Sequence, residues 1–281
     1  SFKSMQTDLA YRAKVGMLHV VRCHRKLDCV SPDFFFKLFD AQVGPVLLYA
    51  SELWGLNDCH VVESVHLQAL KRFLHVPLQT PNIIAYGETG RYPISITAML
   101  RAIKYWLRIL EMDPSRYPRK VYNMMLQSGN TNWATDIEIV LCRYGFEQVW
   151  KEQSVGNKSG FLRDLRGRLI AEFVDDWSTK LESSTRYEFY RQFKNTCNRE
   201  VYLYHLDKQI YRDIMIRFRA GVSQLYIHKY RFYKDDLDDF TCPSCNEEDE
   251  DEEHVLFRCP AYEELRKKFI FSLFDQLVSI Q

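Results

Sequence analysis

The chain has 281 residues, enough for one large domain or two ordinary domains that each bury a core. Hydrophobic residues make up 46% of it and aromatic residues 14%, a composition that excludes a disordered tail. No apolar run reaches the roughly twenty residues of a transmembrane helix, so we expect no membrane partner.

The formal net charge is +1, but the acidic residues are unevenly distributed. Eleven of the 37 acids lie in residues 235–253, so the rest of the chain carries 26 acids against all 38 Lys and Arg residues, a net charge of +12. Gathered on one face, these bases would suit a nucleic acid; spread evenly, they would be ordinary solvated helix surfaces. The sequence leaves both interpretations open.

Residues 1–114 are predicted to form a helical domain. Apolar periodicity with interspersed bases, among them Arg12 and Lys14, indicates a helix from Thr7 to Cys29. A second helix should start with Ser31 as N-cap and Pro32 at its first position, and Pro45 should kink or end its first half. A third follows Asn57 and Asp58, and 77–90 reads as a loop with Gly87–Gly90 at its end. The helix opened by Pro93 carries Arg101, Lys104 and Arg108 on its polar face.

Three phrases of this part resemble the segment that follows the polymerase core in LINE-type (non-LTR) retrotransposon reverse transcriptases. They are LFDAQVGPVLLYASELWG, ALKRFLHVPLQTPN and YGETGRYPISITAMLRAIKYWLRIL, and they match in order and spacing. The chain departs from the family at Ala50, where glycine is usual. The resemblance implies a helical, thumb-like domain that braces the template-primer duplex. It also implies a nuclear location, a parent protein with a polymerase core that performs target-primed reverse transcription, and an endonuclease as partner activity.

Residues 115–234 are predicted to form a further helical region. Helices are expected over Asp136–Trp150 and Phe161–Glu182, the second with Leu165, Leu169, Trp177 and Leu181 on one stripe. Two tracts, residues 186–206 and 211–234, interleave Tyr and Phe with Arg and Lys. Such tracts suit stacking of unpaired bases and phosphate contact, but aromatic rows at helical spacing also form ordinary cores.

Other possible sites are better explained by structure. Phe173-Val174-Asp175-Asp176 has the composition of a reverse-transcriptase metal-binding turn, but its flanks have helical period and it follows the thumb-like phrases. We therefore expect an amphipathic helix and no polymerase catalysis in this chain. Two clusters, Cys23, His24 and Cys29 and then Cys59, His60 and His66, lie on predicted apolar helices and are expected to be structural.

Residues 235–281 are predicted to form a small CCHC zinc module. Cys242, Cys245, His254 and Cys259 follow the spacing C-x2-C-x8-H-x4-C, in which two sulfurs and two later ligands can close a tetrahedron. Four protein ligands leave no position for water, so a Zn²⁺ here would be structural. The alternative is four unconnected residues. The five other cysteines, Cys23, Cys29, Cys59, Cys142 and Cys197, are scattered and odd in number, which favours a reducing, intracellular compartment.

The leading hypothesis is a mainly α, non-catalytic part of a LINE-type reverse transcriptase that supports binding of template RNA or target DNA. The start lacks an initiator Met and a signal-peptide core and reads as a fragment that begins inside a domain. The alternative is a zinc-stapled protein-interaction domain derived from a retroelement. The acidic loop would repel phosphate, so we expect the zinc to lock the last helix against the aromatic tract. The residues predicted to contact phosphate are Arg12, Lys14, Arg101, Lys104, Arg108, Arg217, Arg219, Lys229 and Arg231.

Overall fold

The structure, a computed structural model, describes residues 2–27, 30–233 and 240–268, and for residues 230–233 only the backbone. It confirms the mainly α fold: within these ranges the β-type pairing is an isolated bridge between Thr241 and Asp249. The helices are α1 Phe2–Lys26, α2 Pro32–Gln42, α3 Gly44–Leu47, α4 Ser51–Trp54, α5 His60–Phe73, α6 Asn82–Thr89, α7 Ile94–Leu110, α8 Tyr117–Gln127, α9 Trp133–Arg143, α10 Glu147–Glu152, α11 Lys158–Ser183, α12 Glu188–Arg191, α13 Tyr202–His205, α14 Gln209–Arg219, α15 Tyr226–Tyr233 and α16 Glu263–Arg266.

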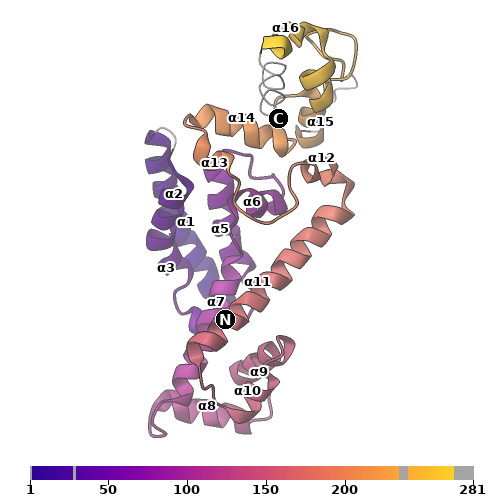
Figure 1. The fold of residues 1–281 in the computed structure, drawn as a ribbon. Coiled ribbons are helices and arrows are strands. Elements are labelled where there is room, and N and C mark those ends of the chain that lie inside the picture. The colour runs from indigo at the N-terminus through magenta and orange to yellow at the C-terminus, as the bar shows by residue number, and fades with distance from the viewer. Residues whose placement is uncertain (1, 28–29, 234–239, 269–281) are drawn as a thin grey trace.

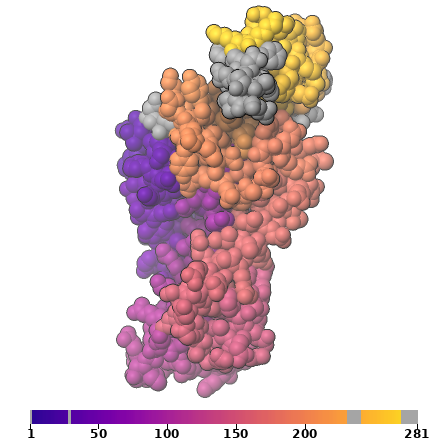
Figure 2. Space-filling view, viewed as in Figure 1, coloured from indigo at the N-terminus to yellow at the C-terminus, as the bar shows by residue number. Residues whose placement is uncertain are grey.

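The helices stack into an elongated molecule (Figure 1). The segment 240–268 lies at one end and helices α8 to α10 lie at the other, and the space-filling view shows the same order from top to bottom (Figure 2). Among the described helices, none is both long enough and apolar enough to span a bilayer.

Two hydrophobic cores hold these helices together. The first core packs α1 to α6 and the start of α7 against Trp177 and Leu181 of α11 and against single residues of α12 to α14. The second core contains Ile103, Trp106 and Leu107 of α7 together with side chains of α8, α9 and the first half of α11. Each core therefore combines residues from both sides of position 114, where the first domain boundary is predicted. The boundaries at 114 and 234 stay predictions about folding units.

Helices α7 and α11 connect the two cores. The predicted apolar stripe of α11 is buried, with Leu165 and Leu169 in the second core and Trp177 and Leu181 in the first. Phe173 packs against both cores and lies inside α11, so the Phe173–Asp176 stretch is helical as predicted. The two helices pack on each other between the cores, and polar residues of both line the same cavity.

Local signals for helix ends are confirmed at the start of the chain. Ser31 Oγ accepts a hydrogen bond from the Phe34 N–H at 3.2 Å, and Pro32 occupies the first helical position. The helix stops at Gln42, and α3 begins at Gly44 beside Pro45. Pro45 has no N–H for the α-helical ladder, which explains why the apolar run breaks there.

Two other predicted elements differ from the structure. The helix expected over Asp136–Trp150 is split into α9 and α10. Gly145 at φ +71° ends α9, and the N–H of Phe146 donates back to the carbonyl of Leu141 at 2.7 Å, as in a Schellman cap. The loop expected at Gly87–Gly90 is also wrong, because α6 continues to Thr89 and ends at Gly90 with φ +60°.

Tertiary contacts of Glu88 explain why α6 continues. Its side chain is completely buried, and Oε1 accepts from Arg219 Nη2 at 3.0 Å while Oε2 accepts from the Tyr202 hydroxyl at 2.8 Å. Arg219 also pairs with Glu200 at 3.1 Å, and the Glu200 N–H donates to the Glu88 carbonyl at 3.0 Å. A local loop tendency is therefore outweighed by long-range bonds that tie α6 to α13 and α14.

The substitution Glu88→Gln should strongly destabilise the protein. A glutamine carries no charge to pair with the largely buried Arg219 side chain, which then keeps Glu200 as its ion-pair partner among the described residues, so we expect the free energy of unfolding to fall by about 3 kcal/mol. Urea denaturation followed by circular dichroism measures this loss. The control Glu147→Gln removes one partner of an exposed pair with Lys151 and should leave the urea midpoint unchanged. Equal effects of the two substitutions would contradict the role given to Glu88.

The substitution Ala50→Gly should stabilise the protein. Ala50 has φ 54° and ψ 23°, a left-handed conformation in which the Cβ clashes with the carbonyl oxygen that follows. Glycine relieves this strain, so we expect a gain of about 1 kcal/mol in the free energy of unfolding. The matched control Ala171→Gly, at an exposed position inside α11, should cost about 1 kcal/mol by the same denaturation measurement. A loss at both positions would show that Ala50 is unstrained.

Candidate metal centre and basic groove

The four predicted zinc ligands meet at one point of the 240–268 segment. Their ligand atoms all lie within 4.8 Å of one another, with Cys242 Sγ 3.9 Å from Cys259 Sγ and Cys245 Sγ 3.3 Å from His254 Nε2. Three of the four residues are buried and Cys245 is partly exposed. Three thiols and an imidazole at these separations can hold one tetrahedral metal ion.

Backbone hydrogen bonds shape the turn that carries the first two ligands. The Asn246 N–H donates to the Cys242 carbonyl at 2.8 Å, and Asn246 itself has φ +58°, a conformation that Asn tolerates better than most residues. The Cys242 N–H donates to the Glu248 carbonyl at 2.8 Å. His254 and Cys259 lie at the two ends of a single helical turn, where the Cys259 N–H donates to the His254 carbonyl at 2.6 Å. The C-x2-C and H-x4-C spacings of the sequence therefore each correspond to one hydrogen-bonded turn.

Neighbouring polar groups prepare the ligands for a metal. Glu248 Oε2 lies 3.1 Å from His254 Nδ1, which leaves Nε2 facing the cysteines. Burial raises the pKa of the Cys242 thiol, but hydrogen bonds from the N–H groups of Ser244 and Cys245 and from His254 outweigh this effect and lower the pKa to about 7. A thiol with this pKa loses its proton readily near neutral pH, and the thiolate is the form that binds metals.

Two acids of the acidic loop attach the cysteine–histidine segment to the rest of the protein. Glu250 Oε2 accepts from the Tyr226 N–H, at the start of α15, at 2.8 Å. Glu252 pairs with His228 Nε2, and His228 Nδ1 lies 2.7 Å from Ser223 Oγ. Glu250, Glu252 and His228 are all buried. These acids therefore make specific internal contacts, a role that their position in an acidic run did not indicate.

Contacts within the segment attach its last described helix to the cluster. Arg266 of α16 is buried and donates from Nη2 to the Cys259 carbonyl at 2.6 Å. The Ser244 and Tyr262 hydroxyls are 2.8 Å apart. Residues 269–281, which complete the helix predicted to be locked by zinc, lie outside the described residues.

The predicted phosphate-binding residues do not form one cluster. Arg101, Lys104 and Arg108 lie together on α7. The others are placed apart. On α1, Arg12 pairs with Asp8 at 2.8 Å, and Lys14 lines a cavity with Asp58 and Glu63. On α14, Arg217 donates to the His75 carbonyl and Arg219 pairs with Glu88 and Glu200, while Lys229 of α15 lies 5.0 Å from the centre of the Tyr226 ring. Arg231 lies on α15, and its side chain is outside the described part.

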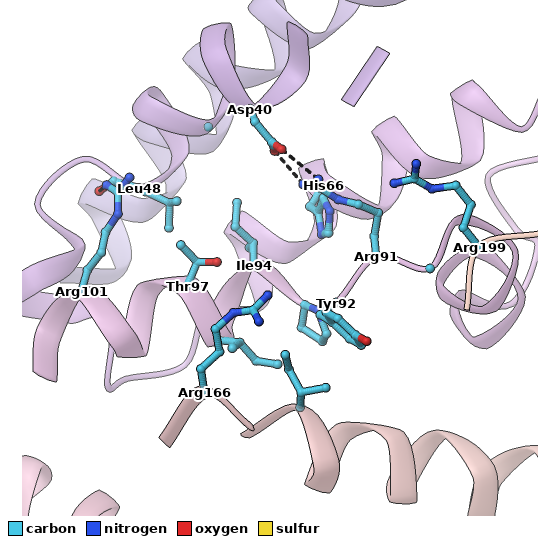
Figure 3. Close-up of a pocket in the computed structure, with 15 residues that line it drawn as sticks. Asp40, Leu48, His66, Arg91, Tyr92, Ile94, Thr97, Arg101, Arg166 and Arg199 are labelled. Atoms are coloured by element: carbon cyan, nitrogen blue, oxygen red, sulfur yellow. Dashed lines mark hydrogen bonds and ion pairs between the residues drawn. The ribbon is translucent and has the colours of Figure 1, made fainter. Parts of the chain in front are cut away.

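The α7 cations line a basic groove between α7 and α11. The groove consists of two adjoining cavities of about 460 and 640 Å³ that share Arg101 in their walls. Figure 3 shows the first cavity, with Arg101 at one side, Arg91 and Arg199 at the other, and Arg166 rising between them. The Lys, Arg, Asp and Glu residues that line the two cavities together are seven bases, Arg91, Arg101, Lys104, Arg108, Lys158, Arg166 and Arg199, and three acids, Asp40, Glu52 and Glu111.

Pairing inside the groove leaves several cations available. Arg91 makes two hydrogen bonds to Asp40, at 2.6 and 2.8 Å, while Arg199 pairs with Asp33 and Lys158 with Glu111. In the described part of the chain, the side chains of Lys104, Arg108 and Arg166 have no hydrogen-bond or ion-pair partner, and all three are exposed. The groove therefore presents unpaired positive charge to solvent.

Three cations of the groove, Arg91, Lys158 and Arg166, were not predicted, and Arg199 was included only in the aromatic and basic tract of residues 186–206. Lys158 and Arg166 lie on α11, Arg91 follows the left-handed Gly90, and Arg199 comes from a distant loop. Arg199 reaches the groove because its Nε donates to the Thr89 carbonyl at 3.0 Å. The polar face of α11 was visible in the sequence, but the packing of that face beside α7 was not.

A scan against protein-family models and searches of curated proteins and of solved structures find no match to this chain.

Proposed function

We propose that this chain binds nucleic acid through the basic groove between α7 and α11, as the non-catalytic C-terminal part of a LINE-type reverse transcriptase. The observation that carries the proposal is the set of unpaired cations in the two adjoining cavities, Arg166 in the first and Lys104 and Arg108 in the second. Arg101, which donates to the Leu48 carbonyl, is shared between the two cavities. Arg101, Lys104 and Arg108 follow one another at i, i+3 and i+7, which spaces them over about 10 Å along one helix face. Such a row suits consecutive phosphates of one strand.

Backbone geometry in the resembling phrases supports this assignment. Ala50, where the family has glycine, is left-handed. A Cβ on Gly55, at the end of the first phrase, would lie 2.4 Å from the Ala98 carbonyl oxygen of α7. A Cβ on Gly90, in the third phrase, would lie 2.3 Å from the Arg199 backbone nitrogen. These phrases therefore mark positions with strict backbone requirements that also shape the groove.

In this proposal RNA or DNA and the polymerase core of the parent protein are the partners, in the nucleus. The other predicted contacts, Arg12, Lys14, Lys229 and Arg231, would extend the binding surface. Arg219 already pairs with Glu88 and Glu200, so it would act mainly by supporting the fold. Arg217 lies outside the groove and donates to the His75 carbonyl.

The groove can be tested by charge removal. The triple variant R101Q/K104Q/R108Q should weaken binding of single-stranded RNA and duplex DNA and lower the log–log salt slope by about 3, because three phosphate contacts are lost. Fluorescence anisotropy across a salt series measures both quantities. The control K3Q/K151Q/K180Q removes the same charge from exposed helix positions and should retain the wild-type slope. Identical behaviour of the two triples, or no binding by the folded wild type at low salt, would rule out the groove.

A protein-interaction domain is the second candidate, favoured by an apolar groove at the far end of the molecule. Its wall includes Phe2, Leu53, Tyr117, Val121 and Trp133, and the Tyr117 side chain is 83% exposed. Surfaces of this kind often mark protein contacts. A folded chain that fails to bind nucleic acid would leave this candidate.

We also propose that the cysteine–histidine cluster holds a structural Zn²⁺. The donor set of three sulfurs and one imidazole nitrogen matches zinc better than magnesium or calcium, which prefer oxygen. The ion would be bound by Cys242, Cys245, His254 and Cys259 and would stabilise the segment that Glu250 and Glu252 attach to α15.

Removing one ligand should release the metal and unfold one end of the molecule. The variant Cys245→Ser should lose the single equivalent of zinc found by elemental analysis, and hydrogen exchange should rise across residues 240–268 while the two cores stay protected. The control Cys142→Ser changes an exposed free cysteine and should keep the metal. Retention of zinc by Cys245→Ser, or a metal-free wild type, would contradict the assignment.

A further inference from the structure

A second basic cavity lies apart from the groove, at a different part of the surface. It has a volume of about 800 Å³ and lies where α1, α5 and α14 end, below the loop that follows α14. It shares no wall residue with the groove between α7 and α11. Its wall residues are Arg25, Arg72, His75, Val76, Pro77, Leu78, Arg217, Val222 and Gln224.

Three arginines converge in this wall from distant parts of the chain. Arg25 comes from α1, Arg72 from α5 and Arg217 from α14, and none of the described residues that form the wall is an Asp or Glu. Arg219 and Arg91, by contrast, are paired with the carboxylates of Glu88 and Asp40. Among the described residues these three make no ion pair. Three guanidinium groups gathered in one wall repel one another, and an anion between them lowers that cost.

The hydrogen-bond donors in the wall are consistent with a bound anion. Arg217 uses Nε and Nη2 to donate to the His75 carbonyl, at 3.3 and 3.1 Å, which directs the guanidinium along this wall. Arg72 Nε is buried without a partner in the described structure. Asp213 is outside the cavity wall, 3.0 Å from His75 Nδ1, and it also accepts from Gln209. Burial alone would raise the pKa of its carboxyl, but hydrogen bonds from His75 and Gln209 and the charge of Arg217 lower it, so this carboxylate interacts with one of the three arginines.

The shape and apolar part of the cavity indicate the class of ligand. A guanidinium fork matches the oxygens of a phosphate. Val76, Pro77, Leu78 and Val222 form an apolar side next to the arginines, and the volume lies in the range of small-ligand sites. We propose that this cavity binds the terminal phosphate of a nucleotide, with the apolar side contacting its sugar and base. The nucleotide is either free or the end of a nucleic-acid strand.

The test compares ligands that differ only in the phosphate. The zinc-loaded full chain is titrated by calorimetry with adenosine 5′-monophosphate, adenosine and inorganic phosphate, and then with one short oligonucleotide carrying either a 5′-phosphate or a 5′-hydroxyl. We expect the monophosphate to bind and adenosine not to bind. Tighter binding of the 5′-phosphorylated strand than of the 5′-hydroxyl strand would identify a strand end as the source, and equal binding of the two strands a free nucleotide.

Variants separate this cavity from the groove. Arg72→Gln should weaken monophosphate binding ten-fold or more, and Arg25→Gln, at an exposed position that the fold does not need, should also weaken it. The groove variant R101Q/K104Q/R108Q should bind the monophosphate like the wild type, so failure of the groove proposal and failure of this one are distinguishable. Equal binding of adenosine and its monophosphate, or unchanged affinity in both single variants, would overturn the assignment.

Discussion

The arrangement of the molecule depends on the buried ion pair between Glu88 and Arg219. A carboxylate without solvent contact is strongly unfavourable unless charged and polar donors surround it, and Arg219 and Tyr202 supply them. The residues are separated by 131 positions, so their pairing brings the end of α14 onto α6. The same attachment places the Arg199 loop over Gly90, which makes one wall of the groove.

The arginines that hold the fold or line the two basic sites fall into two groups, those that pair with acids and those that have no ion-pair partner in the described part of the chain. Arg219 and Arg91 neutralise acids and hold the fold or the rim of the groove. Arg166 and Arg108 have no partner in the described structure and remain exposed, while Arg25 and Arg72 line a cavity without carboxylates. A net charge near zero is thus compatible with two local sites of strongly positive potential, because most of the excess acid lies in residues 235–253.

The acidic stretch contributes to attachment as well as to charge. Glu248 orients His254, while Glu250 and Glu252 reach the start of α15 and His228. The cysteine–histidine cluster and the acids that flank it consequently form one unit: a bound ion would fix the turn, and the turn would present the acids to the helical body. This arrangement explains how a segment with so small a core can hold a defined position.

Sequence by itself determined the features that depend on neighbours along the chain. The clustering of the three cysteines and the histidine, the Ser31 cap, the break near Pro45 and the helical setting of Asp175 and Asp176 all follow from short spacings, and the structure agrees with each. The split between α9 and α10 had a local signal in Gly145, but a continuous apolar period hid it.

Only the tertiary structure decided which charges are free. In the sequence, Arg217 and Arg219 cannot be told apart from exposed bases of a helix, yet they donate to groups more than 130 residues away. Arg166 and Arg199 join the groove because α7 packs on α11 and Gly90 admits the Arg199 backbone. Whether a given Lys or Arg is paired depends on which acid or carbonyl from a distant part of the chain lies next to it. Periodicity along one helix contains no information about such contacts.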